Sequence, residues 1–188
     1  MLQRGKVFVN SRSGAQLEVL RVPKIAGDAA DAILEVRRVL RPGMGFPVPH
    51  VHLDLEESFR VERGIADATV GRRRLRLGRD DVLVVARNTP HMNPCNRSRE
   101  DVVLVQTFSP GTESACRFVE TLGDLLARGR DFRGDLPPDA AMALFGATDA
   151  QTFARALPRA LQRRVVFPLA APVARWRRTY PPGERTTV

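Results

Sequence analysis

The chain has 188 residues, which suits one domain or one domain with an appendage. Apolar residues make up 43% of the chain, enough for a core, and this share excludes wholesale disorder. The net charge of +9 is almost entirely arginine, since Lys6 and Lys24 are the only lysines. Aromatic residues are only 6% of the chain, and few lie near the arginine clusters, which argues against a nucleic-acid-binding face.

The sequence also predicts where the protein resides. The first ten residues lack the apolar core of a signal peptide, and no apolar stretch is long enough to span a bilayer. Cys95 and Cys116 form neither a CxxC motif nor a disulfide framework. We therefore expect a cytoplasmic protein with reduced thiols and with no membrane or nucleic-acid partner.

Short segments rich in β-branched residues follow one another over residues 6 to 109, separated by turn signals such as Arg41-Pro42-Gly43. The predicted strands are residues 6–10, 16–22, 32–40, 48–53, 57–63, 68–77, 81–87 and 101–108. Strands and helices do not alternate, which argues against a parallel α/β sheet. The pattern predicts a mainly β domain, an antiparallel sandwich or barrel, over residues 1–112.

The pattern becomes helical after Pro110. Residues 113–128 have the periodicity of an amphipathic helix, and Pro138 suits the first turn of a second helix. A third helix is predicted over residues 149–157, and a kinked helical stretch, interrupted by prolines, over residues 159–178. We interpret residues 113–180 as a helical extension that packs on the barrel or on a dimer partner, and residues 181–188 as a flexible tail.

All three histidines of the chain stand where one metal site would need them. His50 and His52 are two residues apart in a predicted strand, so their side chains point to the same face. His91 follows a valine-rich run and a Thr-Pro pair, and is expected to arrive from a separate strand. The alternative is a set of partly buried, hydrogen-bonded histidines without an ion.

A carboxylate completes this set. Simple alternation along the strand would select Asp54 or Glu56, but the next predicted strand favours Glu57, because alternation places it on the apolar face with Phe59 and Val61. An inward carboxylate is costly unless it has a partner, and a metal ion is a suitable one. An ion pair with an arginine is the alternative.

These residues resemble the two motifs of the cupin superfamily. The first motif is matched by His50-Val51-His52, Glu57 and Gly64, and the second by Gly78, residues 81–85 and Pro90-His91. Asn88 stands where the second motif has glycine, and asparagine tolerates the left-handed backbone of that turn. The C-terminal residues 161–164 and 177–181 resemble those of small bacterial single-domain cupins with a helical extension.

The resemblance implies a double-stranded β-helix, or jelly-roll barrel, that holds one divalent transition metal ion on His50, His52, Glu57 and His91. Three imidazoles and a carboxylate suit Fe, Mn, Ni, Zn, Co or Cu. The resemblance implies a metal-dependent enzyme, similar to dioxygenases or isomerases, that acts on a small, partly apolar or aromatic molecule. A non-catalytic binding or sensing cupin with a structural metal is the alternative.

Two further expectations concern ligands and assembly. Phe59 and Val61 are expected to form apolar walls against the substrate. Gln106 shares a strand face with Leu104 and Phe108, so it either touches the substrate or is a satisfied polar residue at the barrel mouth. Because single-domain cupins commonly pair, a homodimer is expected.

Overall fold

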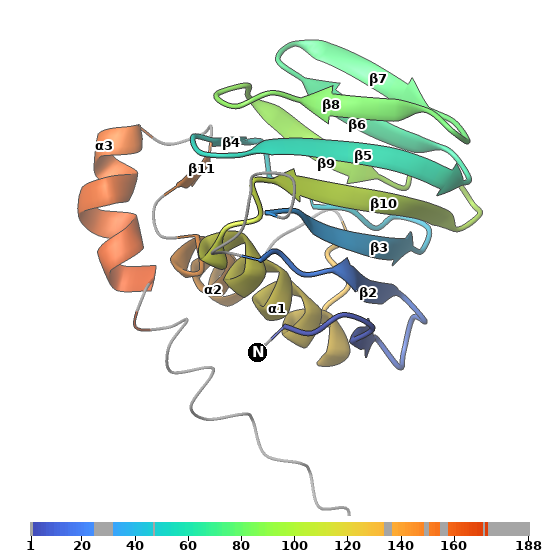
Figure 1. Cartoon of the computed structure of the whole chain (residues 1–188), viewed down its shortest axis with the longest axis horizontal. Helices are drawn as coiled ribbons and strands as arrows, with labels where there is room; N and C mark the ends of the chain where they lie inside the picture. Colours follow the sequence, from blue (N-terminus) through green and yellow to red (C-terminus); the bar gives the residue numbers. More distant parts are fainter. Residues whose placement is uncertain are drawn as a thin grey trace, which may run out of the picture.

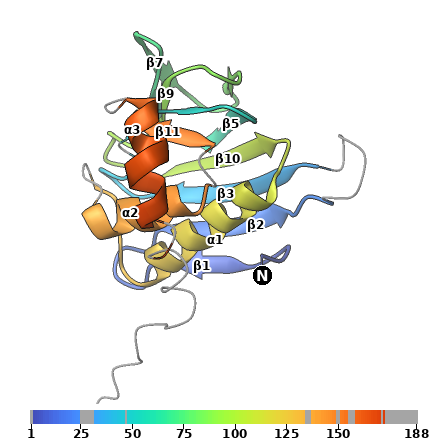
Figure 2. The same cartoon turned by 90° about the vertical axis from the view of Figure 1, so that its left-hand side faces the viewer.

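The computed structural model describes residues 2–24, 32–46, 48–133, 137–148, 151–154, 158–170 and 172. Two antiparallel sheets pack face to face, with helices gathered at one side (Figures 1 and 2). The six-stranded sheet has the order β1-β2-β3-β10-β5-β8 and the five-stranded sheet the order β11-β4-β9-β6-β7. Their bounds are β1 Val7–Val9, β2 Gln16–Arg21, β3 Leu34–Leu40, β4 His50–His52, β5 Glu56–Arg63, β6 Ala66–Val70, β7 Arg73–Leu77, β8 Val82–Val85, β9 His91–Cys95, β10 Val102–Ser109 and β11 Thr152–Ala154.

The pairing of the strands defines a jelly roll. β3 pairs with β10, β4 with β9, β5 with β8 and β6 with β7, all antiparallel. The eight strands therefore form one long hairpin, closed at the β6–β7 turn and rolled so that its successive pairs alternate between the two sheets. This topology confirms the mainly β, double-stranded β-helix expected from the sequence.

Alternating side chains build the core between the sheets. In β3 every second residue is buried, from Leu34 to Leu40, and in β5 the inward residues are Glu57, Phe59 and Val61. Burial of such apolar side chains is the main force that closes the barrel. Phe59 and Val61 have no exposed surface, so both lie deep in this core.

The observed elements differ from the expected ones at three places. The strand expected over residues 68–77 is a hairpin, because Gly71 adopts a left-handed φ of 60° between β6 and β7. A separate strand was expected to carry His91, but none of the predicted strand ranges includes residues 91–95, where β9 forms. Its Pro94 lies where the register with β6 shifts, an irregularity at which a residue without an N–H is tolerated.

The third difference lies in the extension. The helix expected over residues 149–157 is wrong at its centre, where β11 forms and pairs with β4. Phe153 of β11 is fully buried and packs on Phe167, so tertiary burial outweighs the local helical preference. The expected third helix otherwise includes residues outside the described ones.

The remaining elements cover one side of the barrel (Figure 2). Helix α1, Glu113–Ala127, begins at its N-cap Thr112 and packs on β1, where Gly123 meets the ring of Phe8. Helix α2, Pro138–Gly146, packs on α1 and has proline in its first turn, as expected. α3, Arg159–Leu161, continues into a π-helical turn, Gln162–Val166, just before Pro168. The tail expected at residues 181–188 lies outside the described residues.

Candidate metal centre

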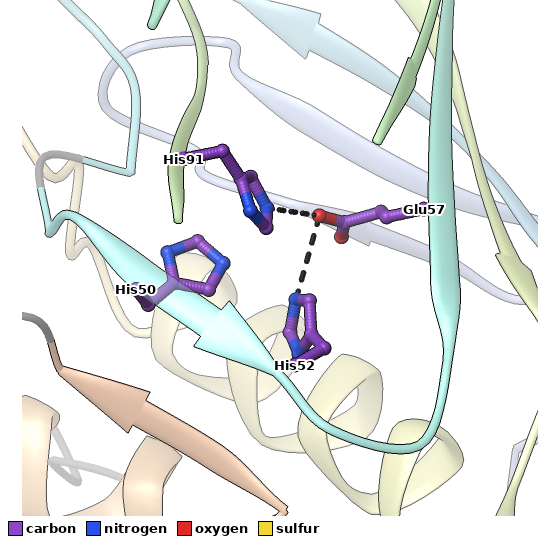
Figure 3. Close-up of side chains that lie close together, drawn as sticks. All are labelled: His50, His52, Glu57 and His91. Atoms are coloured by element: carbon purple, nitrogen blue, oxygen red, sulfur yellow. Dashed lines mark hydrogen bonds and ion pairs between the residues drawn. The ribbon is translucent and has the colours of Figure 1, made fainter. Parts of the chain in front are cut away.

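The four residues expected to bind metal converge between the two sheets (Figure 3). His50 and His52 come from β4, His91 from β9, and Glu57 from β5 in the opposite sheet. The register places His50 directly opposite His91, and all four side chains are buried. Residues from two distant segments and from both sheets therefore meet at one point.

The separation of their ligand atoms suits a single ion. One nitrogen or oxygen from each residue lies within 4.8 Å of all the others. Atoms that bind one ion at about 2.0–2.2 Å lie roughly 3–4.4 Å apart, so the four atoms are close to the spacing that coordination requires.

The second nitrogen of each imidazole is engaged elsewhere. Nδ1 of His50 and His91 lies 2.8 Å and 3.0 Å from the carbonyl oxygens of Val48 and Thr89. Because a carbonyl only accepts, each Nδ1 carries the proton, and each Nε2 presents a lone pair to the site when the ring is neutral.

His52 is held by the extension. Its Nδ1 lies 2.8 Å from Oγ1 of Thr152, which stands opposite it on β11. Within the described part of the chain, its buried Nε2 makes no hydrogen bond, and Oε2 of Glu57 lies 3.5 Å away. A buried nitrogen without a partner is costly, and a metal ion would satisfy it, so the residues present fit the ion that the motifs imply.

Electrostatics prepare the set for a cation. Burial, together with the neighbouring His52 and His91, lowers the pKa of His50 to about 3, so this imidazole is neutral. Burial alone would raise the pKa of Glu57, but His52 and His91 hold it well below its usual range. Burial likewise opposes the charge on His91, yet its 2.9 Å contact with Glu57 raises its pKa. The site therefore contains a buried carboxylate with nearby imidazoles.

A narrow pocket opens beside the imidazoles. Its apolar walls are Phe46, Phe118 of α1, and Leu144 and Phe145 of α2, and its polar lining outside the ligand set is Asn93, Thr148 and Thr152. The open space has room for roughly one water molecule. Phe59, Val61 and Gln106, the residues expected to contact a substrate, do not line it, and such a contact stays a prediction.

Gln106 instead forms a hydrogen bond with Glu57, one of the four candidate metal ligands. Its Nε2 donates to Oε1 of Glu57 over 2.6 Å, and its Oε1 accepts from Arg38 over 3.2 Å. The sequence did not point to Arg38, Asn93 or Thr152. The alternation of buried residues along its strand places Arg38 on the inward face, and this pattern could have drawn attention to it.

Two other motif residues, Asn88 and Gly64, have structural roles, and so does Gly45. Asn88 has a φ of 60°, as expected for the residue that replaces glycine in its turn. Gly64 has a φ of 84°, and a Cβ there would lie 2.6 Å from the carbonyl oxygen of Asp101. At Gly45, a Cβ would lie 2.3 Å from the Cβ of Cys95, so this glycine lets the loop before β4 approach β9.

The topology and the buried ligand set together define a small protein with a cupin fold whose four inward residues can hold a metal ion. No family model matches the sequence, and no curated protein sequence is significantly similar to it. Several solved structures are similar in fold over part of the chain.

One is a conserved protein with a double-stranded β-helix domain from Klebsiella pneumoniae, with 21% identity and a TM-score of 0.40 over 50% of this chain and 79% of that one. Another is KdgF from Halomonas sp., with 21% identity and a TM-score of 0.41 over 56% and 94% of the two chains. The cupin domain of Cnp3 from Schizosaccharomyces pombe has 18% identity and a TM-score of 0.41, and the match spans 51% of this chain and 64% of that domain.

One further finding concerns membranes. Among the described residues, no helix is both long and apolar enough to cross a bilayer.

Proposed function

We propose that this protein is a metal-dependent enzyme, similar to dioxygenases or isomerases, that acts on a small, partly apolar or aromatic molecule. The observation that carries the proposal is the buried ligand set at the base of an apolar pocket. A bound divalent metal would polarise or activate an oxygen atom held at the site. Four protein ligands leave a position for such an atom when the ion is five- or six-coordinate.

The chain's own residues would select and orient the substrate. The rings of Phe46, Phe118 and Phe145 form walls that favour an apolar or aromatic body. Asn93 adds a buried side-chain amide to the lining, and its Oδ1 can accept from a hydroxyl or N–H group of the ligand. The preferred ligand therefore combines a metal-binding oxygen, an apolar body and a donor.

Entry of such a molecule requires the pocket to widen, because its present space admits little more than water. Widening would have to displace the rings of Phe118 and Phe145, which belong to α1 and α2 rather than to the barrel strands. Closure of these helices over a bound substrate would also exclude bulk water from the ion.

Oxygen uptake tests the proposal. The Fe(II)- and Mn(II)-loaded proteins are assayed with catechols, flavonols and diketones, and isomerisation of hydroxycarbonyl compounds is followed in parallel. We expect turnover with at least one metal form, lost in Glu57→Gln and retained in Glu56→Gln, whose carboxylate is exposed on the outer face. No turnover by any metal form would contradict the enzymatic proposal.

One observation favours a second candidate, a non-catalytic binding or sensing protein. Outside the metal residues, the described pocket lining offers only the neutral polar side chains of Asn93, Thr148 and Thr152. Such groups bind a ligand without supplying a general acid or base. Tight binding of a small molecule by the metal-loaded protein, without any product, would support this candidate.

A further inference from the structure

A chain of buried polar side chains leads from the metal residues across the six-stranded sheet. Glu57, Gln106 and Arg38 lie on the three adjacent strands β5, β10 and β3, and all three face inward. Glu57 stands opposite Phe108, and Arg38 opposite Leu104, so Gln106 lies diagonally between them. This register brings the three side chains within reach of one another.

The hydrogen bonds divide the two oxygens of Glu57 between different tasks. Oε1 accepts from Nε2 of Gln106 over 2.6 Å. Oε2 faces the imidazoles, 2.9 Å from Nε2 of His91 and 3.5 Å from Nε2 of His52. With Oε1 occupied by the amide, Oε2 is the oxygen that remains for an ion.

Arg38 determines which end of the Gln106 amide faces Glu57. A guanidinium has donors only, so the amide must present its oxygen to Arg38 and its NH₂ group to Glu57. The reverse orientation would place an amide oxygen against a carboxylate oxygen and leave both without a donor. Burial lowers the pKa of Arg38 to about 10, against the effect of Glu57, which still leaves it charged at neutral pH.

We propose that Arg38 and Gln106 are positioning residues that hold Glu57 as a one-oxygen metal ligand, with Oε2 turned toward the three imidazoles. This inference rests on the proposed metal-dependent function, but it concerns the metal-binding step alone. Outer partners of metal ligands typically change metal affinity by about 10–100-fold when they are removed.

Titration with Co(II) tests the proposal, because the visible spectrum of Co(II) reports its coordination directly. Gln106→Met removes the donor to Glu57, and Arg38→Met frees the amide to turn. Each variant is expected to bind Co(II) about 10–100-fold more weakly and with an altered spectrum. Arg38→Lys, which keeps a donor and the charge, should restore part of the affinity and the spectrum.

Two outward-facing neighbours provide matched controls. Arg37 directly precedes Arg38 in β3, but its side chain points to the outer face, where it pairs with Glu18 and Glu62. Thr107 adjoins Gln106 and is half-buried on the opposite face of β10. Arg37→Met and Thr107→Val should bind Co(II) with the affinity and spectrum of the original protein.

Circular dichroism identifies the folded variants. Folded Gln106→Met and Arg38→Met proteins with unchanged Co(II) affinity and spectrum would overturn the proposal. If one methionine variant fails to fold, the other decides, and if both fail, Gln106→Asn, whose shorter amide does not span Glu57 and Arg38, replaces them: weaker affinity with a shifted spectrum supports the proposal, and unchanged values overturn it. Failure of the original protein to bind Co(II) would overturn both this inference and the proposed function, whereas Co(II) binding without turnover leaves this inference intact.

Discussion

At the scale of single residues, each of the four ligand candidates has a second partner that directs it. Two imidazoles are fixed by backbone carbonyls two residues earlier, the third by Thr152, and the carboxylate by Gln106. The ligand atoms are therefore oriented before any ion arrives. Preorganisation of this kind reduces the entropy that metal binding must overcome.

The two adjacent glutamates provide a direct test of the ligand assignment. Glu57→Gln should lose stoichiometric metal binding, since its neutral amide replaces a buried carboxylate that faces the imidazoles. Glu56→Gln alters an exposed side chain and should keep full metal content. Metal analysis after dialysis measures both, and equal metal content in the two variants would refute the assignment.

The histidine pair should be equally necessary. The double variant His50→Ala, His52→Ala removes two of the four ligands and is expected to abolish stoichiometric binding. We expect the fold to persist, because metal adds stability only by binding to the native state and the barrel has its own core. Metal analysis with circular dichroism checks both parts.

Metal affinity should depend on pH through His91. The raised pKa of this imidazole means that the metal-free site holds its proton above the usual value of 6.5, and a metal ion must displace that proton. Affinity should therefore fall as pH decreases through the pKa of His91, by about tenfold per pH unit below it. His50, with a pKa of about 3, adds nothing in this range. Isothermal titration between about pH 8 and pH 5.5 checks this, and a constant affinity would contradict it.

Sequence reasoning at this scale succeeded where periodicity carries the signal. Alternation placed Glu57 inward beside Phe59, and the structure agrees. It could not identify the partner of Gln106, because the diagonal pairing of β3, β10 and β5 depends on a register between segments far apart in the chain. The role of Thr152 was hidden for the same reason.

At the scale of elements, glycines in two turns meet different requirements. Gly64 and Gly14 both adopt a positive φ, but only Gly64 lies against other backbone, while the space around Gly14 is open. The turn that follows β5 therefore needs a glycine for two reasons, and the turn before β2 for one.

The comparison of two alanine variants separates these reasons. Gly14→Ala should cost about 1–2 kcal/mol of unfolding free energy, the usual penalty of a left-handed backbone for an L-residue. Gly64→Ala should cost about 1–3 kcal/mol more, because its Cβ would overlap the carbonyl of Asp101. Urea unfolding measures the difference, and equal losses would show that the contact relaxes without cost.

Elements also show where local patterns mislead. The segment 149–157 was expected to be helical, yet the three residues of β11 within it extend the sheet beside β4, where Phe153 is buried. β9 contains a proline within the sheet, which a local interpretation excludes from a central strand. In both segments tertiary contacts decide the conformation, and single-sequence patterns do not contain them.

At the scale of the whole molecule, the extension is part of the barrel's core and of its pocket. Val119 and Leu122 of α1 belong to the main core cluster, and Phe118 lines the pocket beside the histidines. Its expected role in a homodimer stays a prediction. The contacts within one chain already explain why the helices lie where they do.

Truncation tests how far the barrel depends on these helices. A chain ending at Ser109 removes α1 and uncovers Phe8, which otherwise packs on Gly123, so we expect an unfolded or aggregated product. A chain ending at Thr148 keeps α1 and α2 but loses β11, and should fold with weaker metal binding because His52 loses Thr152. Solubility, circular dichroism and metal content distinguish the two. A soluble, metal-loaded product ending at Ser109 would show that the helices are dispensable.

The jelly-roll pairing has a consequence for synthesis on the ribosome. Because β4 must wait for β9 and then for β11, the imidazole of His52 acquires its hydroxyl partner only after residue 152 has emerged. Non-local pairings of this kind form late. A metal ion would therefore meet the fully supported ligand set only after β11 has been synthesised and has paired with β4.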